Sequence, residues 1–194
     1  MDPNVTLEGH FVRLEPLGLH HLDGLCAVGL DPDIWAWTPR HVASREDLRG
    51  YVEEAIAGRE AGHMAPFATI LRGEDRIVGS TRFGNITPEH RRVEIGWTWV
   101  APPWQRTAVN SEAKLLMLRH AFEDAGCIRV ELKTDALNLR SRRAMLGIGA
   151  SEEGTLRQHV ITASGRLRDT VYYSILKEEW PRTRDILEAR LARN

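Results

Sequence analysis

The stretch RVEIGWTWVAPPWQRTAVNSEAKLLMLRHAFEDAG, residues 92–126, changes its pattern twice. Residues 91–100 are rich in β-branched and aromatic side chains, which predicts a strand. Pro102-Pro103 end this strand, because proline has no N–H group for a sheet ladder. Residues 110–125 have apolar positions at helical spacing before Gly126, which predicts the longest helix of the chain. Residues 105–110 therefore lead from a strand directly into a helix N-terminus.

This connection is a candidate anion site. The first turn of a helix offers N–H groups without internal partners and the positive end of the helix dipole, so a loop that enters it from a strand suits phosphate. Most strand-to-helix turns bind nothing, and a plain connection is the alternative. Arg106 would attract a phosphate, whereas Glu112, in the predicted first turn, would weakly repel one.

The flanking sequence extends this unit on both sides. Period-2 and β-rich runs predict strands over 10–17, 66–72, 76–86, 128–136 and a hairpin over 155–176 with its turn at 163–166. Helical spacing predicts helices over 20–30, 44–62, 138–146 and an amphipathic C-terminal helix at about 181–193. This order predicts an α/β fold with a mixed, mostly antiparallel central sheet and helices on both faces, in one domain over residues 1–194. The C-terminal helix would either cover the domain or form a homodimer contact.

Composition excludes several function classes. The formal net charge of −1 removes the overall attraction to nucleic acid or to an anionic membrane. We see no secretory signal and no run of apolar residues long enough to span a membrane, so we expect a cytoplasmic protein. Cys26 and Cys127 lie in apolar surroundings without metal-ligand spacing, which predicts free, buried thiols. The scattered histidines predict no metal site.

Two local stretches resemble a known family. EIGWTWVAPPWQRTAVNSEA (94–113) resembles the strand, splayed loop and helix of the GCN5-related N-acetyltransferases, and NLRSRRAMLGIGA (138–150) resembles their later helix motif. GHFVRLEPL (9–17), RIVGSTRFGNI (76–86) and DTVYYSILKEEW (169–180) look like the branch of ribosomal-protein N-terminal acetyltransferases. The resemblance covers nearly the whole chain and implies an acetyltransferase fold that binds acetyl-CoA.

The resemblance implies where acetyl-CoA binds. The family's loop usually reads Gln or Arg, two residues, Gly, one residue, then Gly or Ala, and the matching positions here are Gln105, Ala108 and Asn110. Alanine adds only a methyl group to the cradle, and Asn110 is a good N-cap residue. We therefore expect the N–H groups of residues 105–110 to hold the coenzyme's pyrophosphate, a set that comprises Gln105, Arg106, Thr107, Ala108, Val109 and Asn110. The family also binds the pantetheine arm through backbone groups of the preceding strand, which points to Trp99 and Val100.

Glu94 is the candidate proton acceptor. It occupies the position in EIGW where this branch places its glutamate base, and its alternative is a solvated strand glutamate paired with Arg91 or Arg92. Strand alternation would put Glu94, Gly96, Thr98 and Val100 on one face. The strand is one residue longer than the common EIGYWL pattern, which predicts a bulge or a shifted exit.

Asn138 and Ser141 lie three apart on the predicted helix, so they face the same way. The resemblance implies that Asn138 holds the pantetheine or the acetyl carbonyl and that Ser141 donates a proton to the departing sulfur. Many relatives place a tyrosine further along this helix, where this chain has Leu146. The alternative for Asn138 is that it caps the helix.

The early helices and their connecting loop should choose the acceptor amine. Trp35, Trp37 and Arg40 in DIWAWTPRH are candidates for an acceptor pocket, as are Arg82 and Phe83, while a tryptophan here could instead belong to the core. The leading hypothesis is acetyl transfer from acetyl-CoA to a primary amine at a protein or peptide N-terminus, by direct attack in a ternary complex. The alternatives are a small-molecule amine or antibiotic acceptor, and a coenzyme A binding or sensing protein without transfer activity.

Overall fold

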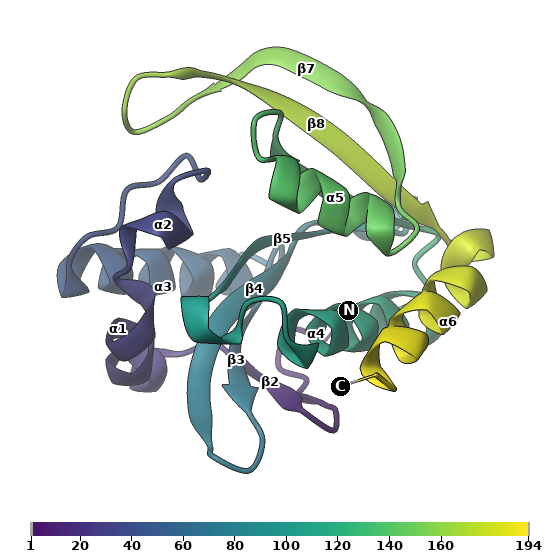
Figure 1. Cartoon of the computed structure of the whole chain (residues 1–194), viewed down its shortest axis with the longest axis horizontal. Helices are drawn as coiled ribbons and strands as arrows, with labels where there is room; N and C mark the ends of the chain where they lie inside the picture. Colours follow the sequence, from purple (N-terminus) through teal and green to yellow (C-terminus); the bar gives the residue numbers. More distant parts are fainter. Residues whose placement is uncertain (1, 194) are drawn as a thin grey trace.

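A computed structural model describes residues 2–193, and Figure 1 shows it as a twisted sheet with helices packed on it. The strands pair in the order β1-β2-β3-β4-β5-β6-β8-β7. Among the described residues, β5 and β6 form the one parallel pair, and the other neighbours are antiparallel. The strands are β1 (Leu7–Glu8), β2 (Val12–Pro16), β3 (Ala65–Leu71), β4 (Arg76–Thr87), β5 (Arg92–Val100), β6 (Arg129–Asp135), β7 (Ser151–Ile161) and β8 (Leu167–Leu176).

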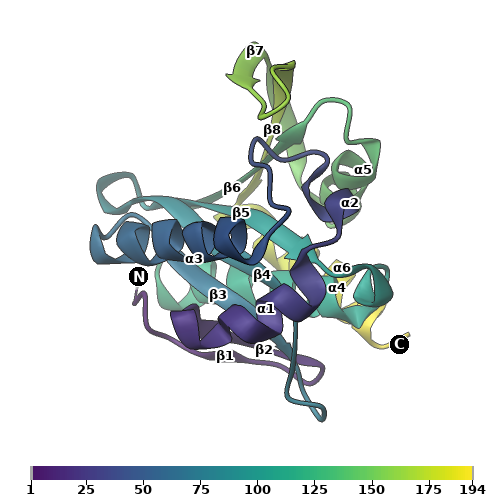
Figure 2. The same ribbon diagram turned by 90° about the vertical axis from the view of Figure 1, so that its left-hand side faces the viewer.

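Helices cover both faces of the sheet, as predicted (Figure 2). They are α1 (Leu22–Gly29), α2 (Pro32–Trp35), α3 (Arg45–Glu60), α4 (Ala108–Arg119), α5 (Leu139–Gly147) and α6 (Trp180–Leu191). The helices α1 and α3 pack on one face, and α4 and α6 pack together on the other. Ser44, the first residue of the predicted helix 44–62, forms the N-cap of α3. Among residues 2–193, none of the helices combines the length and the apolar content that a membrane span requires.

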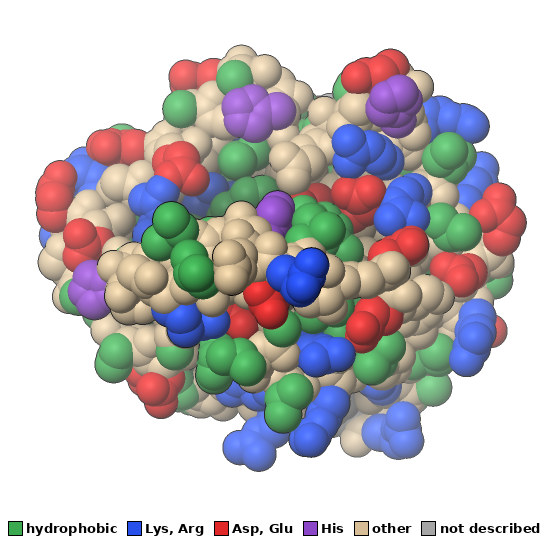
Figure 3. Space-filling model, turned by 90° about the horizontal axis from the view of Figure 1, so that it is seen from above, with side chains coloured by type: hydrophobic (Ala, Val, Ile, Leu, Met, Phe, Trp, Pro, Cys, Tyr) green, Lys and Arg blue, Asp and Glu red, His purple; other side chains and the backbone are tan. Residues whose placement is uncertain are grey.

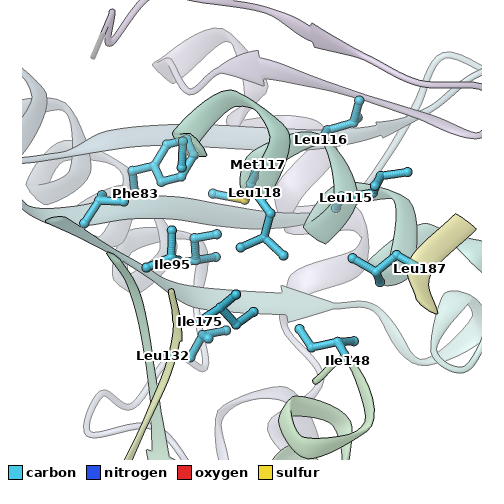
Figure 4. Close-up of a cluster of buried hydrophobic side chains, with 14 of the residues drawn as sticks. Phe83, Ile95, Leu115, Leu116, Met117, Leu118, Leu132, Ile148, Ile175 and Leu187 are labelled. Carbon is cyan, nitrogen blue, oxygen red and sulfur yellow. The ribbon is translucent and has the colours of Figure 1, made fainter. Parts of the chain in front are cut away.

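Two apolar cores lie on opposite sides of the sheet. The larger one joins β-strand residues such as Ile95 and Leu132 to α4 and α6, and Figure 4 shows Met117, Leu118 and Leu187 within it. Leu187 of α6 is fully buried there, so the C-terminal helix covers the domain. This is the first of the two roles predicted for that helix. The smaller core lies under α1 and α3. The two cysteines are free thiols, although only Cys127 is buried.

β5 carries the predicted bulge. Its pairing with β4 shifts between Arg82↔Gly96 and Ser80↔Trp99, so β5 has one residue more than β4 over this interval, and Trp97 takes a left-handed φ of 50°. The predicted common face is therefore wrong beyond Gly96. The Thr98 side chain contacts Lys114 of α4, on the face opposite the one that α3 covers.

β5 and β6 separate just before the bulge. Their parallel pairing covers only Arg92 to Glu94 on β5, against Arg129 to Glu131 on β6. Beyond this point β6 continues along β8, while β5 continues along β4. The result is a gap between two strands of one sheet, with α4 and α5 on one side of it and α3 on the other (Figures 1 and 2).

The β7–β8 hairpin arches over α5 and turns at residues 162–166, close to the predicted turn (Figure 1). β7 is an edge strand, and almost all of its residues are exposed. Its ladder with β8 is interrupted twice, and Gly154 and Gln158 both have positive φ. The hairpin turn contacts the loop after α2, where the Ala163 N–H donates to the Pro39 carbonyl at 3.0 Å.

Candidate active site

The end of β5 exposes a backbone edge to the gap. The Ala101 N–H donates to Val78 of β4 at 2.9 Å. Successive residues of a strand direct their backbone groups to opposite edges, so the N–H and carbonyl of Val100 face the gap. The Trp99 carbonyl lies against Gly79 of β4 instead. Of the two residues predicted to contact the pantetheine arm, the structure therefore turns the backbone of Val100, and not that of Trp99, toward this space.

The helix that follows starts earlier than predicted. Thr107 is the N-cap of α4, because its hydroxyl accepts from the Val109 N–H at 3.3 Å, and the helix begins at Ala108. The predicted start at Asn110 is wrong, since Asn110 already lies within the first turn and does not cap the helix. The left-handed residue of this loop is Arg106, with φ of 63°, so neither matched small position, Ala108 or Asn110, needs a glycine.

Glu112 does not lie at the helix N-terminus as predicted. Its buried carboxylate accepts from the N–H groups of His10, Phe11 and Val12 at 2.6–2.8 Å and so holds the turn between β1 and β2. A side chain at Gly9 would collide with it. The first turn of α4 is therefore free of the predicted carboxylate repulsion, and N–H groups there remain without helical partners.

Gln105 joins the two walls of the gap. Its Nε2 donates to the Val100 carbonyl at 2.8 Å, and Arg140 of α5 donates to its Oε1 at 2.7 Å. Arg140 and Arg143 are exposed on α5. Lys and Arg side chains gather along the lower edge of Figure 3. This edge is the side that faces the viewer in Figure 1, where α4, α5 and α6 lie in front of the sheet. This side of the gap suits a ligand with several phosphates.

Asn138 caps α5, since its Oδ1 accepts from the Ser141 N–H at 3.0 Å. The alternative that Asn138 caps its helix is thus confirmed, and this hydrogen bond engages the side-chain oxygen of Asn138. Within residues 2–193 the half-buried Ser141 hydroxyl makes no hydrogen bond. Ser141 therefore keeps an uncommitted donor at the N-terminal end of α5.

Glu94 lies at the point where the β5–β6 pairing ends, and it is only 2% exposed. Its Oε2 accepts from Asn85 Nδ2 at 2.7 Å and lies 3.0 Å from the Lys133 Nζ. Its Oε1 lies over Gly96, where an added Cβ would come within 2.8 Å of it. In the described part of the chain no donor contacts Oε1. The carboxylate is thus fixed through one oxygen and free at the other, and it does not pair with Arg91 or Arg92.

A polar hollow of about 510 Å³ opens beside this carboxylate, on the face that α3 covers. His63 follows α3, Asn85 comes from β4, and Tyr172 comes from β8. The second carboxylate of the hollow, Glu131, is paired with Arg92 at 3.1 Å and with Arg129. Of the two carboxylates that line this hollow, Glu94 is therefore the one that keeps an oxygen without a donor among the described residues.

The loop after α2 contributes to a second hollow of about 180 Å³, against the turn of the β7–β8 hairpin. Trp35 and Arg40 line it. Trp35 is 6% exposed, packs on Tyr51 and Trp99, and belongs to the smaller core, as the alternative stated. Arg40 forms an ion pair with Glu54. Trp37 is exposed and contributes its carbonyl to Arg168.

Arg82 and Phe83 of β4, which were predicted to line the acceptor pocket, do not reach the surface. Arg82 is fully buried, stacks on the Tyr51 ring at 4.1 Å and donates to the Tyr51 carbonyl at 3.0 Å, so it attaches α3 to the sheet. Phe83 is also fully buried, and its ring contacts Phe67 and His120. It lies in the larger core, across the sheet from Glu94.

Two residues that contact Glu94 were missed at the sequence level. Asn85 and Lys133 come from β4 and β6. Asn85 lies in the stretch 76–86 that resembles the family, but neither residue was predicted to belong to the site. The signal for Lys133 is the parallel register that places Glu94 beside Glu131, two residues before Lys133. Among residues 2–193, His, Cys, Asp and Glu side chains form no cluster of three that could hold a metal.

Residues 12–151 match the model of the acetyltransferase (GNAT) domain, so the chain belongs to the GNAT family. It is 30% identical over 150 residues to the uncharacterized N-acetyltransferase YnaD of Bacillus subtilis (strain 168), covering 77% of this chain and 84% of that one. It is 32% identical over 104 residues to YdaF of the same strain, 54% of this chain and 56% of that one, whose name provisionally describes a ribosomal N-acetyltransferase.

A solved structure of a GCN5-related N-acetyltransferase from Brucella melitensis is similar as well. It is 30% identical, has a TM-score of 0.88, and the match covers 97% of this chain and 86% of that one. The fold, the family and the gap described above define an acetyl-CoA-dependent N-acetyltransferase with an amine acceptor. The resemblance found in residues 94–113 and 138–150 is confirmed.

Proposed function

We propose that the acceptor is the terminal amine of a protein or peptide and that Glu94 removes its proton. The observation that carries this proposal is the Glu94 carboxylate, which lines the hollow and which Asn85 and Lys133 fix through Oε2, while Oε1 has no donor among the described residues. A general base needs both a fixed position and a free lone pair. The polar hollow beside it has room for the first residues of a chain.

The coenzyme would lie on the opposite side of the gap, against α4 and α5. Among residues 105–110, the N–H groups of Gln105 and Val109 already donate to Pro102 and Thr107. The remaining N–H groups of this segment would hold the pyrophosphate, and the Val100 N–H would hold the pantetheine arm. Bound there, the coenzyme supplies an acetyl thioester at the open end of the β5–β6 pairing. Asn138 supports this wall by capping α5, which presents the Ser141 hydroxyl.

Transfer follows by direct attack in a ternary complex. The amine nitrogen forms a bond to the acetyl carbon, Glu94 Oε1 takes the amine proton directly or through water, and the carbon–sulfur bond breaks. Ser141 supplies the proton that the departing thiolate requires. An acetyl-cysteine intermediate is disfavoured, because Cys127 is buried and burial raises the pKa of its thiol.

The loop after α2 supports a chain end as acceptor. Residues 36–41 contact the β7–β8 turn through Ala163 and Pro39, and Arg168 contacts the Trp37 carbonyl. A loop held in this way would admit an extended N-terminus more readily than a bulky folded surface. The relative whose name describes a ribosomal N-acetyltransferase supports the same class. The same closure also suits a small-molecule amine, which is the second candidate.

The test combines turnover and binding. Peptides with a free N-terminus should be acetylated on the α-amine, as mass spectrometry would show, and peptides with a blocked N-terminus but a free lysine should not. Glu94→Gln should lower kcat by about 100-fold or more while coenzyme affinity stays unchanged. Glu89→Gln, an exposed carboxylate outside the site, is the matched control.

Three outcomes would contradict parts of this proposal. Acetylation restricted to small amines would overturn the acceptor class. Full turnover by Glu94→Gln would overturn the base assignment. Coenzyme binding without turnover on any amine would favour a binding or sensing role over transfer.

A further inference from the structure

Lys133 of β6 holds a primary amine against the carboxylate that is proposed as the base. Its Nζ lies 3.0 Å from Glu94 Oε2, and Asn85 donates to the same oxygen at 2.7 Å. The Lys133 side chain is 27% exposed, so a reagent can reach its amine, whereas Glu94 is buried. Transfer requires an amine beside a general base. Lys133 therefore lies beside Glu94 as an acceptor amine would, although on the other carboxylate oxygen.

The Lys133 side chain also extends across the gap between β5 and β6. The parallel pairing ends at Glu131, and Lys133 lies two residues further along β6, where β5 has separated from it. Its Nζ nevertheless lies 5.7 Å from the ring centroid of Trp97, the left-handed residue of the β5 bulge. It lies 5.7 Å from the Tyr172 ring of β8 as well. The amine is thus at the open end of the pairing, which is where the proposed function requires the acetyl thioester.

The two other lysines of the chain have different surroundings. Lys114 is 9% exposed in α4, its Nζ donates to the Thr98 hydroxyl at 3.1 Å, and burial lowers the pKa of its amine to about 7. Lys177 follows β8 and is exposed. In the described part of the chain, Lys133 is the one lysine that is paired with a carboxylate. The three lysines therefore provide an internal comparison between a buried amine, an exposed amine and an amine at the base.

We propose that Lys133 is acetylated by the active site of its own chain, with acetyl-CoA as the donor. The inference rests on the proposed function of Glu94 and of the gap. The Lys133 ammonium gives one proton to Glu94, and its nitrogen then forms a bond to the acetyl carbon. The carbon–sulfur bond breaks, and the second proton of the nitrogen passes to the departing thiolate. The products are acetylated Lys133, free coenzyme A and one proton, which Glu94 releases to water.

This modification alters the base itself. Acetylation removes the charge of Lys133 and with it the ion pair to Glu94. Among the described residues, Asn85 then remains as the one donor to the Glu94 carboxylate. A base that is held less firmly transfers protons less effectively. Acetylation of Lys133 therefore slows transfer to an external acceptor, and it accumulates when no acceptor competes for the thioester.

Isotopic labelling measures this reaction. The full-length protein is incubated without acceptor in acetyl-CoA whose acetyl group carries a heavy isotope, and the labelled lysines are located by mass spectrometry. We expect Lys133 to be labelled at least about tenfold faster than Lys177, because its amine is held beside a base, unlike a lysine in a peptide. The rate constant should not depend on protein concentration, since the reaction occurs within one molecule.

A second donor and three variants test the chemistry. Acetyl phosphate, which reacts with amines without the coenzyme site, should label exposed Lys177 at least as fast as Lys133. Glu94→Gln should bind coenzyme A but lose the preference for Lys133, whereas Glu89→Gln, the exposed control, should retain it. Lys133→Arg should show no fast labelling. In the wild type, peptide turnover should fall in proportion to the acetylated fraction of Lys133.

The outcomes separate this inference from the proposed function. Normal peptide acetylation with Lys133 labelled no faster than Lys177 would overturn this inference alone. The same ratio of Lys133 to Lys177 labelling with both donors, or fast Lys133 labelling in folded Glu94→Gln, would also contradict it. Unchanged peptide turnover by fully labelled protein would refute the effect on the base. If neither a peptide nor Lys133 were acetylated, the proposed function and this inference would fail together.

Discussion

The two oxygens of Glu94 have different surroundings, and the free one depends on a glycine. Gly96→Ala adds a Cβ within 2.8 Å of Oε1, so the carboxylate must move from the position that Asn85 and Lys133 fix. Because Gly96 does not have a positive φ, the substitution itself is compatible with the backbone. We expect kcat to fall about 10- to 100-fold, measured by steady-state acetylation, with little change in the melting temperature.

Gly50→Ala is the control for this variant. Gly50 lies in α3, and nothing lies within 4 Å of an added Cβ. It should retain full activity, and alanine should stabilise the helix slightly. Full activity of Gly96→Ala would show that the free Oε1 is not needed for transfer.

Single residues also show how far local patterns can be trusted. Asn138 was predicted either to cap its helix or to bind the coenzyme, and the cap is present. Asn110 was predicted as a cap because of its residue type, but Thr107, three residues earlier, performs this role. Residue types that can cap a helix are recognisable in the sequence. Which of several neighbouring candidates becomes the cap depends on where the preceding loop ends and the helix begins.

At the scale of elements, the β7–β8 hairpin depends on one buried acid at the end of β6. Asp135, 1% exposed, forms an ion pair with Arg166, lies 4.0 Å from Arg168 and accepts from the Leu137 N–H. Asp135→Asn leaves two guanidinium groups without their carboxylate. The free energy of unfolding should drop by about 3 kcal/mol in urea titrations.

Hydrogen exchange locates the effect of this substitution. Amides of β8 and of the 162–166 turn should exchange faster, and those of α4 should not. Asp185→Asn, on the exposed surface of α6, is the control and should change neither quantity. If Asp135→Asn were as stable as the wild type, the hairpin would have to be held by its ladder with β6 alone.

The bulge in β5 shows which features of a strand can be predicted from its pattern and which cannot. The extra residue in EIGWTWV predicted an irregularity correctly, but simple alternation then put Thr98 on the wrong face. Likewise, β4 residues Arg82 and Phe83 read as surface candidates, although both are fully buried. Alternation assigns two faces, and it cannot tell which face is covered by a helix from elsewhere in the chain.

For the whole molecule, the charge of Lys114 opposes folding, and the sign can be worked out. An unfolded lysine holds its proton up to about pH 10.4, whereas Lys114 in the folded protein releases it at about pH 7. Between these values the unfolded state binds more protons, so the wild type gains stability as the pH rises, by up to about 1.4 kcal/mol per pH unit. The penalty is complete below pH 7.

Lys114→Met removes this penalty. In urea titrations without coenzyme it should be more stable than the wild type at pH 7, and the difference should shrink toward pH 9. Lys177→Met should show no such trend. A constant difference between wild type and Lys114→Met across this pH range would mean that the buried lysine keeps its proton throughout.

Most of the architecture was predictable because the elements carry their own signals. The order of strands and helices, the mixed sheet and helices on both faces follow from periodicity and turn residues. The surroundings of Glu94 were not, because Asn85 and Lys133 reach it through sheet pairing between distant segments. The burial of Lys114 also could not be predicted, because it depends on how α4 packs on β5.

The irregular outer strand has a consequence for how copies of this protein meet in a crowded solution. An exposed sheet edge invites strand addition by another chain, and uninterrupted edges are a common route to aggregation. The ladder of β7 with β8 is interrupted twice, and Gly154 and Gln158 have positive φ. The free edge of β7 therefore offers only short regular segments with which another strand could pair. The protein can therefore expose the whole of β7 with little risk that another copy adds a strand to it.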